Sequence, residues 1–432
     1  MLKAFGFCVF GDDILEALKY GINSSLKYIK SLLKWILVSI LVGFIGGLVG
    51  SLFHISIDAV TNLRMENTWL IFFLPFGGLL ITASYELFKK EGKIDTNRVI
   101  ESVRSSKSIP LIMAPLIFFG TVVTHLFGGS AGREGAALQL GGSIGYNLGK
   151  GFKFNEDDMH IVVMSGMSSV FAALFGTPLT AAFFSLEVIS VGVMHYAGLV
   201  PCIVSAITAS QIALFFGISP VCFKFTNMQT LSADVLIKAI ILAVLCAVVS
   251  IIFCLAIKYC EHYSKKFFKN RYIRTFVGGT LIVLLSLLFG TYDYNGAGME
   301  IISRAINGTA RPEAFLIKIL FTVITISAGF RGGEIVPTFF IGSTFGCVIG
   351  GILGLNPGFG AALGFVALFC GVVNCPVASV ILALEVFGGD SIIVFAAVCA
   401  VSYMMSGYFG LYKSQKIVYS KLDEQYIDIN TK

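Results

Sequence analysis

The fold is decided by the stretch Gly128-Gly129-Ser130-Ala131-Gly132-Arg133-Glu134-Gly135, which continues as AALQLGGSIG to Gly145. It places an ionisable pair, Arg133 and Glu134, among glycines inside long apolar runs. A charge at such a depth is costly and is tolerated only where it lines a cavity or meets a partner. Flanking glycines let the backbone leave its helix and present N–H groups to a small ligand. The stretch therefore predicts a helix N-terminus aimed at an anion, with Gly132, Arg133 and Gly135 around the anion and Glu134 as the titratable, competing group.

The composition predicts a membrane protein. The chain has 432 residues, of which 56% are hydrophobic and 13% are charged, whereas soluble domains carry about 25% charged residues. The net charge is +6, and lysines gather before the first apolar run and after the last. By the positive-inside tendency, we expect a multi-pass protein of the cell (plasma) membrane with both termini in the cytoplasm. The lipid membrane is then its surroundings, and nothing supports a nucleic-acid partner.

The apolar runs predict many helices, several of them too short to cross the bilayer as straight rods. Short segments broken by glycine or proline are typical of half-helices that meet near the middle of the membrane. The fold class expected is an all-α polytopic membrane protein with two inverted structural repeats of tilted and broken helices. Its expected parts are 1–33, a cytoplasmic amphipathic helix on the membrane surface; 34–222, the first membrane repeat; 223–412, the second; and 413–432, a cytoplasmic tail with the end of the last helix. The runs lie at about 35–60, 69–88, 109–127, 136–149, 159–175 and 197–217, then 233–258, 273–291, 314–329, 335–354, 359–373, 376–387 and 391–411.

Two pairs of motifs carry the repeat. Residues 176–188, GTPLTAAFFSLEV, resemble residues 374–386, NCPVASVILALEV, and their glutamates Glu187 and Glu385 are 198 apart. Residues 132–145 resemble residues 332–346, and Glu134 and Glu334 are 200 apart. Two motifs that recur at nearly the same offset predict two repeats whose broken segments converge on one site.

These residues resemble the CLC family of chloride channels and anion/proton antiporters. Gly132 to Gly135 look like its GREGP motif, residues 332–337 lie where the family has its GxFxP motif, and residues 416–420 look like the segment with its anion-binding tyrosine. The resemblance covers about residues 35–425. It implies a homodimer with one pore in each subunit, an external gating role for Glu134, and no cofactor. Gly333, Ile335 and Val336 would join the anion-binding residues.

The departures from the family pattern point to a branch within it. The serine-containing GSGIP motif is absent, and Gly92-Lys93-Ile94-Asp95-Thr96-Asn97 occupies its neighbourhood. Val188 stands where chloride/proton antiporters often carry an internal proton-transfer glutamate, while an acid appears at Glu334. This combination resembles the fluoride/proton antiporter branch, although Val336 replaces its threonine. Fluoride export in exchange for protons is the favoured function; a chloride/proton antiporter or a passive voltage-gated-type chloride channel is the alternative.

Several site residues have competing interpretations. Glu134 is either a gate or the partner of Arg133, and Glu334 is either a proton-transfer and anion-site group or the partner of Arg331. The anion-binding tyrosine is Tyr419, with Tyr412 as the rival. Thr96 and Asn97 either donate to the anion or cap a helix. Because they recur symmetrically, Glu187 and Glu385 suit structural hydrogen bonds at helix ends or an interface.

Metal and enzyme chemistry have little support. The ten cysteines are scattered without a CxxC pair, and the five histidines form no cluster, so we expect no metal site. His125 is expected to be a packing residue. Gly128 to Gly132 also fit GxSxG, which makes an intramembrane serine protease with Ser130 a remote alternative. No histidine is marked as its base, and a protease explains neither Glu134 nor Glu334; we therefore expect a transporter and no enzyme.

Overall fold

Sixteen α-helices make up most of the part of the chain that the structure describes. The computed structural model covers residues 2–88, 95–105, 107–223, 229 and 231–432. The first eight helices are α1 (Leu2–Glu66), α2 (Leu74–Leu87), α3 (Thr96–Ser105), α4 (Met113–Leu126), α5 (Glu134–Gly151), α6 (Glu156–Phe175), α7 (Pro178–Glu187) and α8 (Leu199–Phe215), with 3-10 helices η1 (Thr68–Phe73) and η3 (Tyr196–Gly198). The second eight are α9 (Ala233–Phe267), α10 (Arg271–Phe289), α11 (Met299–Ile306), α12 (Ala314–Ala328), α13 (Ile335–Ile352), α14 (Pro357–Val373), α15 (Pro376–Phe387) and α16 (Ile392–Met405).

The two sets of helices match in order, which confirms the predicted repeat. Helices α5 and α13 both have 18 residues and both follow a glycine-rich motif. The next helix packs against each of them, α6 on α5 and α14 on α13, and the short helices α7 and α15 contact each other. Seven helices within the described residues are long and apolar enough to cross a membrane, and five more are apolar but shorter. The structure is thus that of a multi-pass membrane protein with broken helices.

Small residues let the central helices pack at backbone distance, as the sequence predicts. A Cβ atom on Gly141 of α5 would lie 2.1 Å from the Gly166 carbonyl oxygen of α6, and one on Gly342 of α13 would lie 2.3 Å from that of Gly364 in α14. Any side chain would therefore separate the helices. Every residue of α14 from Gly358 to Val373 is buried. Much of the core accordingly lies within the α5–α6 and α13–α14 pairs.

Local chemistry sets the helix starts. The Asn155 side chain accepts a hydrogen bond from the Asp158 N–H at 2.8 Å, and three acidic residues occupy the first turn of α6. This is the predicted start of that helix, stabilised by a cap and by the helix dipole. Pro178 and Pro376 open α7 and α15, where a missing N–H has no effect on the hydrogen-bond ladder.

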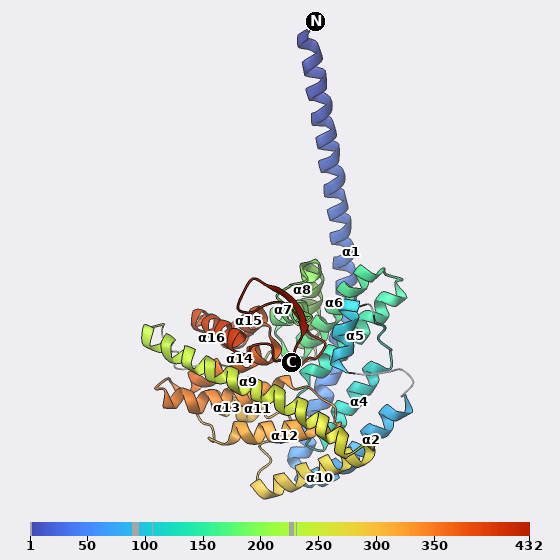
Figure 1. The fold of residues 1–432 in the computed structure, drawn as a ribbon. Coiled ribbons are helices and arrows are strands. Elements are labelled where there is room, and N and C mark those ends of the chain that lie inside the picture. Colours follow the sequence, from blue (N-terminus) through green and yellow to red (C-terminus); the bar gives the residue numbers. More distant parts are fainter. Residues whose placement is uncertain (1, 89–94, 106, 224–228, 230) are drawn as a thin grey trace.

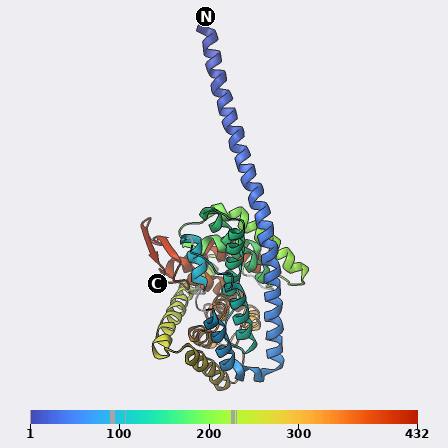
Figure 2. The ribbon, with the colours of Figure 1, turned by 90° about the vertical axis from the view of Figure 1, so that its right-hand side faces the viewer.

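No break in the helix marks the predicted boundary after residue 33. Helix α1 runs without a break from Leu2 to Glu66 and projects as one rod from the body of the molecule (Figures 1 and 2). No glycine- or proline-rich break separates the lysine-rich start from the first span, so the helix propagates through both. The side chains of residues 2–24, which carry much of the amphipathic pattern, lie outside the description of the structure.

The sequence analysis placed the end of the last helix in the C-terminal tail, but the structure shows no helix there. Helix α16 ends at Met405, and residues 413–432 instead form the strands β2 (Lys416–Tyr419) and β3 (Tyr426–Asn430). Strand β2 pairs antiparallel with β3 and parallel with β1 (Ser190–Val191), which follows α7. This three-stranded sheet ties the tail to the end of the first repeat. Helix α11, in a mostly polar segment between apolar runs, also went unpredicted.

Candidate anion and proton site

The two glycine-rich motifs meet in space. Gly132 and Gly333 form an isolated antiparallel β-bridge in which the N–H of each donates to the carbonyl oxygen of the other at 2.7 Å. A Cβ on Gly333 would lie 2.4 Å from the Gly135 nitrogen, and one on Gly135 would lie 2.8 Å from the Gly333 Cα. Only glycine fits at such an approach. The N-termini of α5 and α13 are therefore held against each other, as the repeat predicts.

Glu134 is the first residue of α5 and is almost completely buried, with 1% of its surface exposed. Its Oε2 accepts a hydrogen bond from the Arg133 backbone N–H at 3.0 Å. The carboxyl group therefore occupies the N-terminal end of the helix, the place where an anion is stabilised by free N–H groups and the helix dipole. A carboxylate there competes with an anion for the same donors.

The Arg133 side chain points to α1, and this position does not support its predicted role at the anion. Its guanidinium Nη1 pairs with Asp58 of α1 at 2.8 Å, while its Nε lies 3.7 Å from Glu134 Oε1. His54 also contacts Asp58, at 2.9 Å. Arg133 is thus anchored to α1, and its weaker contact with Glu134 does not engage the carboxylate as a close ion pair. Asp58 explains how a charge is tolerated beside the glycines.

Glu334 occupies the N-cap position of α13 and lines a cavity. Its Oε2 lies 3.5 Å from where a Cβ on Gly135 would stand, so the carboxyl group reaches the first turn of α5. No ion pair joins it to Arg331, whose guanidinium lies over the Tyr85 ring at 3.9 Å. Among the described residues, no lysine or arginine pairs with the Glu334 carboxylate. Its position favours the proton-transfer and anion-site interpretation over the ion pair.

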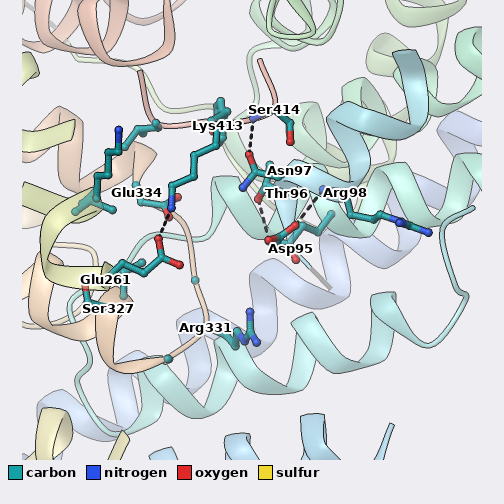
Figure 3. Close-up of a pocket in the computed structure, with 18 of the residues that line it drawn as sticks. Asp95, Thr96, Asn97, Arg98, Glu261, Ser327, Arg331, Glu334, Lys413 and Ser414 are labelled. Carbon is teal, nitrogen blue, oxygen red and sulfur yellow. Dashed lines mark hydrogen bonds and ion pairs between the residues drawn. The ribbon is translucent and has the colours of Figure 1, made fainter. Parts of the chain in front are cut away.

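The cavity that Glu334 lines has a volume of about 1170 Å³. Its wall is strongly basic (Figure 3). Among the residues that the structure describes, eleven basic and four acidic side chains line it. They are Arg98, Arg104, Lys107, Lys258, Lys265, Lys269, Arg271, Arg274, Arg331, Lys413 and Lys432, with Asp95, Glu101, Glu261 and Glu334. Within this wall, Lys107 donates to Glu101 at 2.7 Å. That hydrogen bond lowers the pKa of the Glu101 carboxyl below its usual value, so Glu101 is charged at neutral pH and offsets one lysine. The excess of positive charge attracts anions into the cavity.

Hydroxyl and amide groups line the same cavity beside Glu334. Tyr412 is 3% exposed, and its hydroxyl has no hydrogen-bond partner among the described residues. Thr96 accepts a hydrogen bond from Gln139 at 3.0 Å, and the Asn97 side-chain oxygen accepts one from the Ser414 N–H at 3.0 Å. Neither Thr96 nor Asn97 is the helix cap, because Asp95 accepts from the Arg98 N–H at the start of α3. Thr96 and Asn97 both line the cavity (Figure 3). Residues 92–94 of the segment considered for the first anion motif lie outside the described part of the chain.

Tyr419 lies away from this cavity, contrary to the favoured prediction. Its side chain is 45% exposed and packs edge-to-face against Tyr426, with ring centroids 5.9 Å apart. Strand pairing between β2 and β3 holds the ring there. The rival prediction, Tyr412, is the tyrosine that the structure places beside Glu334 and Thr96.

Ile335 and Val336 open α13 as fully buried residues. A Cβ on Gly132 would lie 2.9 Å from the Val336 Cβ, so the Val336 side chain packs directly on the bridge. Only Glu334 and Gly332 of this motif line the cavity. Ile335 and Val336 can therefore offer their backbone N–H groups as part of a helix N-terminus, while their side chains shape the apolar wall.

Comparison with known proteins identifies the scaffold. The family model described as "Voltage gated chloride channel" matches residues 77–407. This chain belongs to that family. A relative named "Chloride/fluoride channel protein", from Pseudomonas syringae pv. tomato, is 33% identical over 410 residues, which are 93% of this chain and 91% of the relative. The H(+)/Cl(-) exchange transporter ClcA of Vibrio campbellii is 25% identical and matches over 78% of each chain.

Solved structures agree with this family assignment. A CLC-type fluoride/proton antiporter superposes with a TM-score of 0.85 at 32% identity, covering 89% of this chain and 98% of the other. A slow cyanobacterial Cl-/H+ antiporter superposes with a TM-score of 0.74 at 20% identity, covering 86% and 94%. The fold is thus that of CLC transporters.

Elsewhere in this voltage-gated chloride channel scaffold, the second repeated pair of glutamates is structural, as predicted. Glu187 accepts from the N–H groups of Val377 and Ala378, at 3.1 and 2.8 Å, at the start of α15. Glu385 accepts from the N–H groups of Leu179 and Thr180, at 2.9 and 2.8 Å, at the start of α7. Each carboxylate thereby caps the partner helix, whose first turn lacks a side-chain cap of its own.

The other candidates have local partners. The His125 Nδ1 lies 2.9 Å from the Thr121 carbonyl oxygen in a buried position, as expected of a packing residue. Ser130 shares a hydrogen bond of 3.0 Å with the Thr322 hydroxyl rather than with a histidine. Within the described residues, no group of three or more His, Cys, Asp and Glu side chains is placed to hold a metal ion.

The sequence analysis missed part of the cavity wall. Gln139 lies five residues after Glu134 on α5 and was treated only as a helix residue. Glu261 and the basic side chains of 258–274 also line the cavity, and Glu261 pairs with Lys413 at 2.6 Å (Figure 3). The charge run between the spans at 233–258 and 273–291 was the available signal, because basic side chains gather there.

Proposed function

We propose that this protein is a proton-coupled anion antiporter that exports fluoride. The observation that carries the proposal is the position of Glu334. Its carboxyl lines a basic cavity, has no ion pair among the described residues, and lies against the helix start that holds the buried Glu134. An anion that enters through the cavity therefore reaches the titratable Glu334 first and Glu134 second. The names of the similar proteins, a chloride/fluoride channel protein and a fluoride/proton antiporter, support fluoride as the anion.

The charges give the order of events. A fluoride ion is attracted into the cavity by its basic wall and loses water as it approaches Tyr412 and Thr96, whose hydroxyls replace that water. An ionised Glu334 repels the anion, so the anion advances when Glu334 carries a proton. Glu134 receives the proton from the opposite side and leaves the helix N-terminus to the anion as it becomes neutral. The proton passes from Glu134 to Glu334, directly or through water, and on to the cavity, while fluoride moves the other way.

The cavity faces the cytoplasm in this proposal, and both termini lie on that side of the plasma membrane. Lysines and arginines of 258–274 and of the C-terminal tail surround the mouth, in accord with the positive-inside tendency. A cysteine introduced at the exposed Lys269 tests the orientation: it should react with a membrane-impermeant thiol reagent only in inverted vesicles.

The family resemblance further implies a homodimer, which light scattering of the purified protein in detergent measures.

Purified protein in liposomes loaded with fluoride or chloride tests the function. Anion efflux and proton flux are recorded together under equal gradients. We expect faster fluoride than chloride efflux and proton uptake that can be driven against its gradient by the anion gradient. Equal or faster chloride efflux with proton movement indicates a chloride/proton antiporter, and anion efflux without proton movement indicates a passive channel.

A matched serine variant addresses the remote hydrolase alternative. We infer no protease function, since Ser130 is hydrogen-bonded to Thr322. Ser130→Ala should keep most of the anion flux. Loss of a measured peptidase activity in this variant, with the parent protein active, would establish the enzyme instead.

A further inference from the structure

Gln139, which no feature of the sequence singled out, forms a buried polar pair with Thr96 at the cavity. Both side chains line the cavity, with 4% and 8% of their surface exposed. The Gln139 Nε2 donates to the Thr96 Oγ1 at 3.0 Å. The Gln139 Oε1 has no partner among the described residues, and neither has the nearby Tyr412 hydroxyl. Buried polar groups are normally paired, so this end of the cavity is prepared for a polar ligand.

The direction of this hydrogen bond leaves the Thr96 proton available to another acceptor. A hydroxyl has one proton and two lone pairs, and the bond from Gln139 occupies a lone pair. Threonines inside helices usually donate to the carbonyl four residues earlier, as Thr124 and Thr325 do here at 2.8 Å. Thr96 is the first residue of α3, so no earlier turn of that helix precedes it, and its side chain lines the cavity. Its proton can therefore point into the cavity.

We propose that Gln139 is a positioning residue that sets anion selectivity by turning the Thr96 hydroxyl proton towards the anion. The inference rests on the proposed function and assigns a selectivity determinant to it. Fluoride is small and strongly hydrated, so its passage depends on close, pre-oriented donors that replace water, and chloride depends on them less. Without Gln139, the Thr96 hydroxyl can rotate and donate elsewhere, which penalises fluoride more than chloride.

The test compares the fluoride-to-chloride ratio of initial efflux from liposomes in six proteins. They are the parent, Gln139→Leu, Thr96→Val, the double variant, Thr96→Ser, and Asn147→Leu as the control. Asn147 is a partly buried amide on the same helix, bonded to the Ser143 carbonyl at 2.8 Å and outside the cavity lining. Because one hydrogen bond to a charged group is lost, we expect Gln139→Leu to lower the ratio about tenfold. Thr96→Val should lower it equally, and the double variant no further, because the two act through one bond. Thr96→Ser, which keeps the hydroxyl, should retain the parent ratio.

The outcomes separate this inference from the proposed function. A parent protein that prefers chloride overturns the function, and this inference falls with it. A parent that prefers fluoride, with an unchanged ratio in Gln139→Leu, overturns the positioning role alone. A parallel fall of both fluxes in Gln139→Leu and Asn147→Leu also overturns it, because a purely structural amide changes the amount of active protein and leaves the ratio unchanged. Independent effects that add in the double variant exclude action through Thr96.

Discussion

The pair Glu187 and Glu385 is symmetric in its contacts, whereas the pair Glu134 and Glu334 is not. Each member of the first pair caps the helix of the other repeat through two backbone N–H groups. In the second pair, Glu134 is buried at the start of α5, and Glu334 lines a basic cavity beside it. A residue with a structural role can make the same contact in both repeats. A transport path has two different ends, one on each side of the membrane. A repeated residue whose surroundings differ between the repeats is therefore the better candidate for a role in transport.

This comparison is most severely tested at Glu134. Glu134→Gln should reduce proton-coupled transport to the level of protein-free liposomes, because the amide keeps the shape of the side chain and cannot titrate. Uncoupled anion leak remains or rises, since the neutral side chain no longer competes with the anion. Simultaneous recording of anion and proton flux provides the measurement. Full proton pumping by the variant would contradict the gating role.

A comparable loss is expected at Glu334. Glu334→Ala removes the carboxyl at the end of the cavity and should stop coupled proton movement. Glu334→Gln should be equally unable to move protons but should keep more anion flux, because its amide can still hydrogen-bond. If Glu334→Ala drives protons against their gradient at the parent rate, Glu334 belongs with Glu187 and Glu385 as a structural residue.

The two tyrosines give a smaller effect. Tyr412→Phe removes a buried hydroxyl at the cavity, and Tyr419→Phe removes one from an exposed ring on β2. Loss of a hydrogen bond to an anion should lower fluoride efflux about tenfold in Tyr412→Phe. Tyr419→Phe is its matched control and should transport at the parent rate. The reverse result would return the anion-binding role to Tyr419.

The symmetric pair should affect stability and leave coupling intact. Glu187→Ala and Glu385→Ala each leave two N–H groups at a helix start without their acceptor, at a cost of about 1–3 kcal/mol for a group that is buried. The bond from Ala378 to Glu187 is buried, whereas the bond from Leu179 to Glu385 is exposed. Both variants should unfold at a lower temperature in detergent, Glu187→Ala by more, with an unchanged ratio of protons to anions. Exposed Glu424→Ala is the control and should unfold as the parent does. A changed ratio in either capping variant would move that glutamate into the transport path.

The sequence predicted what local pattern and repetition encode. The offsets of Glu134 from Glu334 and Glu187 from Glu385 indicated which segments converge, and Asn155 with its acidic neighbours marked a helix start. Contacts between residues far apart in the sequence could not be predicted from local pattern. Strand β2 is only four residues long, and its pairing with β1 brings together residues more than 220 positions apart. That pairing and the turn before it decide that Tyr412 faces the cavity while Tyr419 does not. Gln139 likewise acquires its meaning from Thr96, which lies on another helix.

The smallest change in coupling is expected at Val188, at the end of α7. Chloride/proton antiporters that this chain resembles often carry a glutamate at the corresponding position, so Val188→Glu asks whether the proton path can be moved there. Val188 is fully buried, and its carbonyl oxygen accepts from Gln415 at 3.1 Å. A carboxyl buried at this position lowers the stability of the protein. Lower stability reduces the amount of active protein but does not change the number of protons transported per anion.

If protons pass through Glu334, the added carboxyl supplies nothing that the cycle lacks, and the ratio in Val188→Glu should equal that of the parent. Val188→Gln controls for the polar side chain without a titratable proton. A ratio that changes in Val188→Glu and stays constant in Val188→Gln would place a proton step at the end of α7. Combined with Glu334→Ala, the same substitution becomes decisive: recovery of proton movement would mean that the scaffold accepts a carboxyl at either position. Continued loss would mean that the proton must enter the site at the start of α13, where the asymmetry between the repeats lies.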